Sequence, residues 1–250
     1  MRVYFTLVRR ELGSYFASLT GYLILAMVAL MFGLSLAVML EALTREPTIV
    51  PLTELFFSTP YFWLVILFAA PVITMRSFAL EKFSGTYETL MTTPVGDLQV
   101  VLAKFTGSLL FYGILWLPLA AGFFLVRGYS RDAVPMDAGL AGATLLGLLL
   151  LGTAFLSLGC LASSLTRSQI VAAMLSFSMG ISLFLLSFLS FIIPPQSTWQ
   201  TALWNQISMI NHMQEFARGI VDTRYVVFYL SLTALSLFLT WRVVESRRWK

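Results

Sequence analysis

Long apolar runs alternate with short polar segments along the chain. Each run approaches the roughly 20 apolar residues that a helix needs to cross the hydrocarbon core of a membrane. The pattern predicts six membrane-spanning helices, near residues 21–40, 59–75, 105–126, 138–161, 170–193 and 225–241. The start of the second span is left open, because residues 52–57 are also mostly apolar. We therefore expect an all-α integral membrane protein in which residues 1–250 form a single transmembrane domain.

The N-terminal segment has helical rather than uniform apolar periodicity. Between residues 3 and 15 the apolar positions recur at helical spacing, while Arg2, Arg9 and Arg10 fall mostly on the other side. This pattern is typical of an amphipathic helix that lies in the membrane surface, here just before the first span.

A second amphipathic segment separates spans two and three. Its apolar positions share one helical face, and Glu81, Lys82, Thr86 and Glu88 lie largely opposite; the apolar set is Leu80, Phe83, Tyr87, Leu90 and Met91. Pro94 is expected to end this helix, because the residue before a proline avoids the helical region. Asp97 is expected to cap the next helix. Such a helix suits a groove on a soluble partner, and it equally suits a position on lipid head groups.

The composition is that of a membrane protein, with 58% hydrophobic and 11% charged residues. Soluble domains average about 45–50% apolar and about 25% charged residues. These values exclude a soluble enzyme, a secreted disulfide scaffold and a disordered chain. The lone Cys160 and the single histidine indicate no metal site.

The basic residues predict the orientation in the membrane. Six spans place both termini on one side, and with the termini inside, eleven of the sixteen Lys and Arg residues are cytoplasmic: Arg2, Arg9, Arg10, Arg76, Lys82, Lys104, Arg167, Arg242, Arg247, Arg248 and Lys250. Lys and Arg near span ends favour the cytoplasmic side. The net charge of +4 is thereby explained by topology, and no nucleic-acid partner is expected.

The predicted span cores contain no Asp, Glu, Lys, Arg or His. Ion-coupled transporters usually carry such residues inside their spans, so any energy for transport is expected to come from a partner. The chain has no phosphate-binding loop, which requires Gly-Lys followed by Ser or Thr, because its three lysines follow Glu81, Ala103 and Trp249. We therefore expect neither an enzyme nor a cofactor bound by this chain. The glycines of span four and the serines of span five are interpreted as helix-packing positions.

The cytoplasmic segment resembles a known family. Arg76, Glu81-Lys82, Gly85-Thr86, Glu88, Leu90 and Pro94, in this order after the second span, resemble the permease subunits of type-2 ABC transporters. The six-span layout and the N-terminal amphipathic helix are similar as well. The resemblance implies a permease of an ABC exporter in a bacterial inner membrane. It also implies a coupling helix that docks on a separate ATPase subunit, with ATP and Mg bound by that ATPase, and a second copy or related permease beside this chain. The implied docking residues are Glu81, Gly85, Thr86, Glu88, Leu90 and Pro94.

Residues 211–224 narrow the resemblance to the branch of gliding-motility-associated permeases. In the wider family this region forms short helices that cap the translocation path on the extracytoplasmic side. The resemblance implies that role for His212, Glu215, Arg218 and Asp222. His212 and Glu215 stand three residues apart on a predicted helix, but two ligands without a third are weak support for a metal site.

Two other functions fit parts of the pattern. A non-transporting membrane scaffold would recruit a cytoplasmic partner through residues 76–95. An intramembrane enzyme would need clustered acids or a histidine pair at the membrane face, which the sequence lacks. Smooth apolar spans suit a lipid, a polymer or a hydrophobic compound equally, so the sequence leaves the transported substrate open.

Overall fold

The computed structural model describes residues 2–45, 52–86, 95–122, 138–188 and 204–246 of the chain, and their regular structure is entirely helical. The helices are α1 (Arg2–Phe16), α2 (Leu19–Arg45), α3 (Leu52–Ser58), α4 (Pro60–Thr74), α5 (Ala79–Ser84), α7 (Asp97–Leu115), α9 (Ala138–Leu165), α10 (Gln169–Leu186), α13 (Met209–Ala217) and α14 (Thr223–Ser246). Within these ranges six helical stretches, which contain α2, α4 with α5, α7, α9, α10 and α14, are long and apolar enough to cross a membrane. The prediction of an all-α integral membrane protein with six spans is confirmed.

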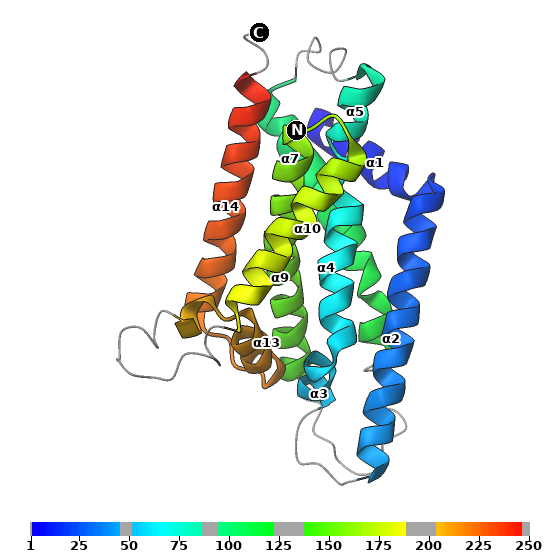
Figure 1. The fold of residues 1–250 in the computed structure, drawn as a ribbon, viewed down its shortest axis with the longest axis vertical. Coiled ribbons are helices and arrows are strands. Elements are labelled where there is room, and N and C mark those ends of the chain that lie inside the picture. Colours follow the sequence, from blue (N-terminus) through cyan, green and yellow to red (C-terminus); the bar gives the residue numbers. More distant parts are fainter. Residues whose placement is uncertain (1, 46–51, 87–94, 123–137, 189–203, 247–250) are drawn as a thin grey trace.

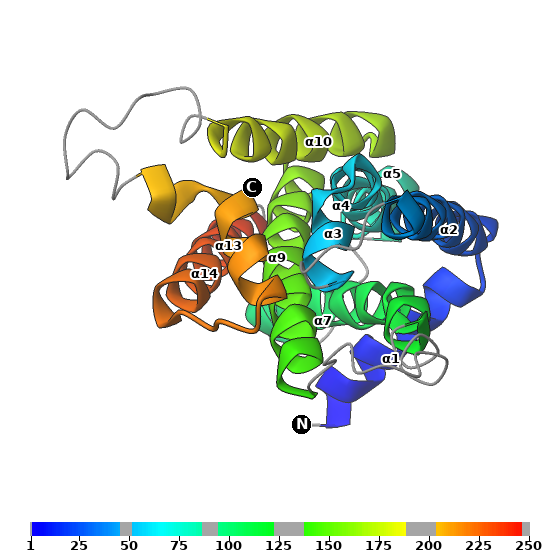
Figure 2. The ribbon, with the colours of Figure 1, turned by 90° about the horizontal axis from the view of Figure 1, so that it is seen from below.

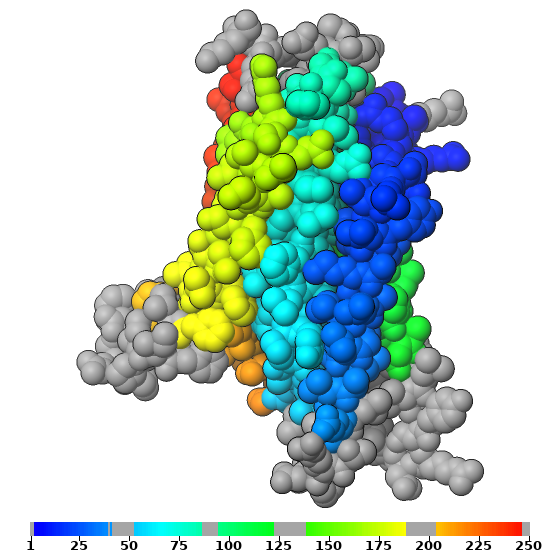
Figure 3. Space-filling model, turned by 45° about the vertical axis from the view of Figure 1, so that its right-hand side comes forward, coloured from blue at the N-terminus to red at the C-terminus, as the bar shows by residue number. Residues whose placement is uncertain are grey.

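The spans form a bundle in which α9 takes the central place. Figure 2 shows α9 surrounded by α4, α7, α10 and α14, and Figure 1 shows the helices running roughly side by side. On the face drawn in Figure 3, α4 lies between α2 and α10. Helices α1 and α5 and the C-terminal end of α14 lie at one end of the bundle, whereas α3 and α13 lie at the other.

Burial divides the spans into an inner and an outer group. More than half of the residues in the spans of α4, α7 and α9 are buried, whereas fewer than a third of those in the spans of α2, α10 and α14 are buried. The exposed side chains of the outer group are large and apolar, for example Leu23 on α2, Met174 on α10 and Phe238 on α14. Such a surface fits contact with lipid chains. Lipid chains are as apolar as these side chains, so burying the side chains within the protein gives no hydrophobic gain.

Close helix contacts in the inner group depend on small residues. At Gly152 of α9, an added Cβ atom would collide with the ring of Tyr112 on α7, and at Gly159 with the side chain of Thr74 on α4. Ser182 of α10 donates a hydrogen bond to the carbonyl of Ser178 on its own helix, at 2.7 Å. These contacts agree with the interpretation of the glycines and serines as packing positions.

The segment between the second and third spans differs from the expected single helix. Helix α5 ends at Ser84, because Gly85 follows in the left-handed region with φ of +74°, a conformation that glycine adopts without steric cost. The prediction of one continuous amphipathic helix in this segment is therefore wrong at Gly85, and residues 87–94 lie outside the described residues. Gly96, not Asp97, is the N-cap of α7, and Asp97 lies in the first turn. Helix α7 thus begins well before residue 105, and Lys104 lies inside it.

The close contact at Gly152 generates a first prediction. We expect Gly152→Ala to lower the melting temperature of the detergent-solubilised protein by several degrees, because overpacking a tight contact costs about 1–3 kcal/mol. Gly142→Ala in the same helix is the matched control, since a Cβ atom at Gly142 meets nothing within 4 Å. Equal melting temperatures for the two variants would contradict the packing between α7 and α9.

Candidate functional site

The N-terminal end of α5 is fixed to the C-terminal end of α9. The hydroxyl of Ser163 accepts hydrogen bonds from the backbone N–H groups of Phe78, at 3.0 Å, and Ala79, at 3.1 Å. The same hydroxyl donates to the carbonyl of Met75 at 3.2 Å. The first N–H groups of a helix have no acceptor within the helix. The hydroxyl of Ser163 provides this acceptor at the start of α5.

Lys82 forms a second link between the same two helices. Its ammonium group is buried and donates a hydrogen bond to the carbonyl of Ser164, near the end of α9. Cations are favourable at the C-terminus of a helix, where unpaired carbonyls gather. The apolar periodicity of the sequence predicts Lys82 on the polar face of a longer helix. In the structure the buried face of α5 contains Ala79 and Lys82, while Phe83 is 77% exposed.

A buried lysine joins α5 to α1 and α7. The ammonium nitrogen of Lys104 lies 2.8 Å from Glu81 Oε1 and 3.1 Å from Glu11 Oε1. Arg10 lies at the more exposed edge, with its Nη2 3.0 Å from Glu11 and 3.3 Å from Glu81. Lys104 is only 3% exposed, and a buried charge is tolerated when it is paired. We call Arg10, Glu11, Glu81 and Lys104 the charge network.

Helix α1 lies close enough for this network because of its packing against α7. A Cβ atom at Gly107 would lie 2.8 Å from that of Glu11, so glycine permits the approach. Tyr15 stacks on Phe111 with 4.6 Å between ring centroids, and its hydroxyl donates to the Ile73 carbonyl at 3.1 Å. Burial raises the pKa of Tyr15 well above its usual range, so the hydroxyl keeps its proton.

The predicted docking residues divide into two groups. Glu81 points into the charge network of its own chain, whereas Gly85 and Thr86 are exposed at the tip of α5. Ser84 and Thr86 share a hydrogen bond of 2.8 Å between their hydroxyl oxygens. Glu88, Leu90 and Pro94 lie outside the described residues. Sequence reasoning missed Lys104 as the centre of the network, because its partners lie far away along the chain.

At the opposite end of the bundle, α3 and α13 are joined by polar contacts. Thr53 donates a hydrogen bond of 2.7 Å to the carbonyl of Ala217. Arg218 donates two to the carboxylate of Glu54, from Nε at 3.0 Å and from Nη2 at 2.6 Å. Phe216 of α13 packs against Gly147 of α9. The pair of α3 and α13 thus covers this end of the inner helices.

His212 is a packed residue of this end. Its ring stacks on Tyr225 with 4.0 Å between centroids, Nδ1 lies 3.2 Å from the Tyr229 hydroxyl, and Nε2 lies 3.3 Å from the Asn205 carbonyl. Desolvation lowers the pKa of His212 to about 4, so the ring is neutral at pH 7.

The other predicted residues of this end have separate positions. Glu215 is half-buried, and its carboxylate interacts with the hydroxyl of Tyr225 through a hydrogen bond and through its charge. Asp222 accepts a hydrogen bond of 2.8 Å from the backbone N–H of Arg224 at the start of α14. In the part of the chain that the structure describes, no three His, Cys, Asp or Glu side chains gather as metal ligands.

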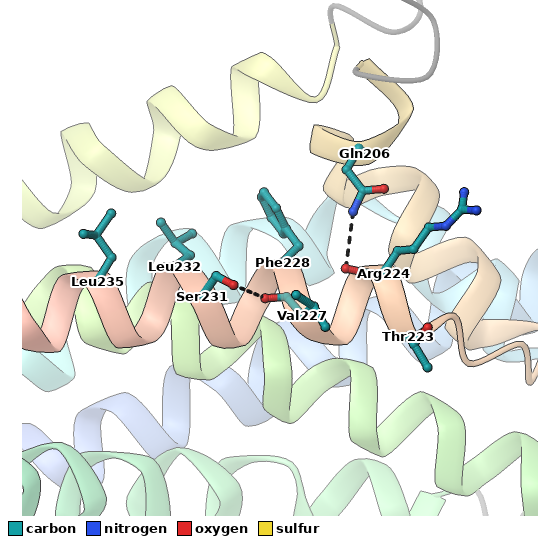
Figure 4. A pocket seen from close by; sticks show the side chains of 8 residues that line it. All are labelled: Gln206, Thr223, Arg224, Val227, Phe228, Ser231, Leu232 and Leu235. Atoms are coloured by element: carbon teal, nitrogen blue, oxygen red, sulfur yellow. Dashed lines mark hydrogen bonds between the residues drawn. The ribbon is translucent and has the colours of Figure 1, made fainter. Parts of the chain in front are cut away.

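An open groove follows the exposed side of α14 near the same end. It has a volume of about 680 Å³. Figure 4 shows Gln206, Thr223 and Arg224 at one end of the groove and Leu232 and Leu235 toward the other, with the Gln206 amide donating to the Arg224 carbonyl. The charged and amide groups lie at one end, and in the middle the hydroxyl of Ser231 donates to the carbonyl of Val227 on its own helix.

The fold and the site define a multi-pass membrane protein whose polar clusters lie at the two ends of an apolar bundle. Residues 51–241 match the family model described as ABC-2 family transporter protein. The chain belongs to this family, and it is an ABC transporter permease, the non-catalytic membrane component that in this family normally works with an ATPase subunit. A comparison with curated proteins found no match.

The position of His212 generates a prediction for stability against pH. Its pKa is about 4 in the folded protein and 6.5 in an unperturbed state. Between these values the unfolded chain binds the extra proton, so stability rises with pH in this window and is lost as the pH falls from 6.5 toward 4. We expect the melting temperature to decrease less between pH 7 and pH 4.5 in His212→Gln than in the unsubstituted protein. The same loss in both proteins would contradict the buried, neutral histidine.

Proposed function

We propose that the permease is part of an ABC exporter in a bacterial inner membrane, with both termini in the cytoplasm, and that an ATPase subunit docks on the tip of α5. The observation that carries this proposal is the construction of α5. Its tip is exposed, yet its body is clamped to α9 by Ser163 and Lys82 and to α7 and α1 by the charge network. A partner that moves the tip would therefore move three other helices with it.

The distribution of basic residues supports the orientation. Among the described side chains, the end of the bundle with α1 and α5 carries Arg9, Arg10, Arg76, Lys82, Lys104, Arg167 and Arg242, and the opposite end carries Arg218 and Arg224. This is the asymmetry expected when the first end is cytoplasmic. Helices α3 and α13 would then cover the extracytoplasmic end.

The coupling follows from the contacts. ATP and Mg would bind to the ATPase subunit, whose closure would shift α5. Ser163 would pass this shift to α9, and α9 would pass it to α13 through the contact of Gly147 with Phe216. Rigid-body movement of packed helices is an established class of transition. The shift would loosen or close the cover that Glu54 and Arg218 hold together.

The exposed outer helices support a paired permease. Helices α2, α10 and α14 present large apolar side chains over most of their length, and a second copy or a related permease would cover part of this surface, with membrane lipid on the rest. We place the chain in the gliding-motility-associated branch on the strength of residues 211–224, which form α13 and the turn into α14.

A prediction for docking concerns Phe83, the large exposed apolar residue at the end of α5. We expect Phe83→Ala to weaken binding of the ATPase about tenfold, because a central apolar contact of about 1.4 kcal/mol corresponds to that factor. The measurement is the affinity of the purified ATPase for the permease in detergent. Phe238→Ala is the matched control, since Phe238 is exposed in the middle of α14. Equal affinities for the two variants would overturn the docking assignment.

A prediction for coupling concerns Lys104. We expect Lys104→Gln to keep ATPase binding but to lower ATP hydrolysis by the reconstituted complex several-fold, because Glu11 and Glu81 lose the cation that joins α1 and α5. Lys104→Arg keeps the charge and should retain most of the activity. Full hydrolysis by Lys104→Gln would show that the charge network does not transmit the movement. A complex that binds the ATPase yet never changes its turnover would instead indicate a scaffold.

A further inference from the structure

A small cavity lies between α1, the turn from α4 to α5, and α7. Its volume is about 270 Å³, which is room for several water molecules or one polar head group, since a water occupies about 30 Å³ in the liquid. The charged side chains that line it are Arg10, Glu11, Arg76, Glu81 and Lys104. Three are cations and two are carboxylates, so the lining carries one unbalanced positive charge.

The unbalanced charge belongs to Arg76. The acids of the lining are already paired with Lys104 and Arg10. The Arg76 guanidinium donates a hydrogen bond of 2.5 Å to the Thr20 hydroxyl, and it forms no ion pair with a carboxylate of the described residues. An arginine at this place can bind a phosphate through its remaining N–H groups.

Two further polar atoms of the cavity are buried and unsatisfied. Glu81 Oε2 is fully buried without a hydrogen-bond partner in the described residues, although Oε1 of the same carboxylate is paired. Ser77 is 5% exposed, and its hydroxyl forms no hydrogen bond of normal geometry, although the hydroxyl of Tyr15 lies near it. Buried polar atoms that lack a partner cost free energy. Because the charge of Glu81 is already compensated, Oε2 requires a neutral donor such as a hydroxyl.

The cavity lies at the level where the spans end. Thr20 stands at the start of α2, and Arg76 follows directly after α4. The surface beside it is apolar, since Phe16, Leu19 and Leu23 are exposed at the bend between α1 and α2. Lipid chains can follow this surface while a head group enters the cavity. Basic pockets between span ends are known to bind lipid head groups.

We propose that this cavity binds an anionic glycerophospholipid with a hydroxyl-bearing head group, of the phosphatidylglycerol type. The phosphodiester lies against Arg76, and a head-group hydroxyl donates to Glu81 Oε2. The acyl chains follow the exposed side chains of α1 and α2. The lipid neutralises the cavity and satisfies its buried carboxylate oxygen, and it places a membrane component between α1 and α5. Binding of the lipid requires neither the ATPase nor transport, so it stands apart from the proposed function.

The test is lipid binding to the delipidated permease in detergent, measured by native mass spectrometry. Dioleoyl-phosphatidylglycerol is compared with dioleoyl-phosphatidylcholine, which has no net charge and no head-group donor. We expect phosphatidylglycerol to bind at least tenfold more tightly. Arg76→Gln should remove this preference, whereas Arg242→Gln should keep it, because Arg242 is an exposed arginine paired with Glu245 on α14. Melting temperatures of both variants show whether each is folded.

Three results would overturn the proposal. Equal binding of the two lipids would show that the cavity does not select an anionic head group and is filled by water. Unchanged phosphatidylglycerol binding by folded Arg76→Gln would place the lipid elsewhere on the surface. Complete displacement of the lipid by millimolar sn-glycerol 3-phosphate would show that a soluble phosphate, rather than a lipid, occupies the site.

Discussion

The pairing of buried Lys104 with Glu11 and Glu81 is the interaction on which the end of the bundle with α1 and α5 depends. A buried ammonium group is costly unless it is paired, and Lys104, which is 3% exposed, is paired with Glu11 of α1 and Glu81 of α5, so the positions of α1 and α5 are tied to that of α7. The two carboxylates come from α1, which precedes the first span, and from α5, at the end of the second membrane-long stretch. One side chain thus holds together parts of the chain that the membrane would otherwise leave separate.

Helix α9 extends this connection across the membrane. Its last turns supply Ser163 and the carbonyl of Ser164 to α5, its middle packs Gly152 against Tyr112, and Gly147 lies under Phe216 of α13. At its end, α9 is joined to α5 by hydrogen bonds, because backbone groups at a helix end need partners. Along its middle, where both surfaces are apolar, α9 is joined to its neighbours by close packing. The same helix therefore contacts both polar ends of the bundle.

The spans could be predicted from the sequence because a helix that crosses the hydrocarbon core needs about 20 apolar residues and satisfies its backbone groups internally. Their ends were harder to predict. The charge of Lys104 alone predicts a position outside the span. In the structure Lys104 lies within α7 and is buried, because Glu11 and Glu81 supply the opposite charge. Helix α5 is shorter than its apolar periodicity indicated, because Gly85 adopts a positive φ and ends it. The pair of Glu54 and Arg218 joins residues 164 positions apart, a contact that no local pattern reveals.

The polar contacts between helices differ in kind from one part of the bundle to another. Ionic contacts bind α1, α5 and α7, and a charged side chain caps the end of α9. The outer helices have weaker links, such as the hydroxyl pair of Ser35 with Thr59 between α2 and the start of α4, at 2.8 Å, and that of Thr233 with Thr153 between α14 and α9, at 3.2 Å. Hydrogen bonds between membrane helices average only about 0.6 kcal/mol, so such contacts can break and re-form at little cost. The ionic contacts therefore join α1, α5 and α7 into one group, whereas α2 and α14 contact the inner helices through apolar packing and hydroxyl pairs of this kind.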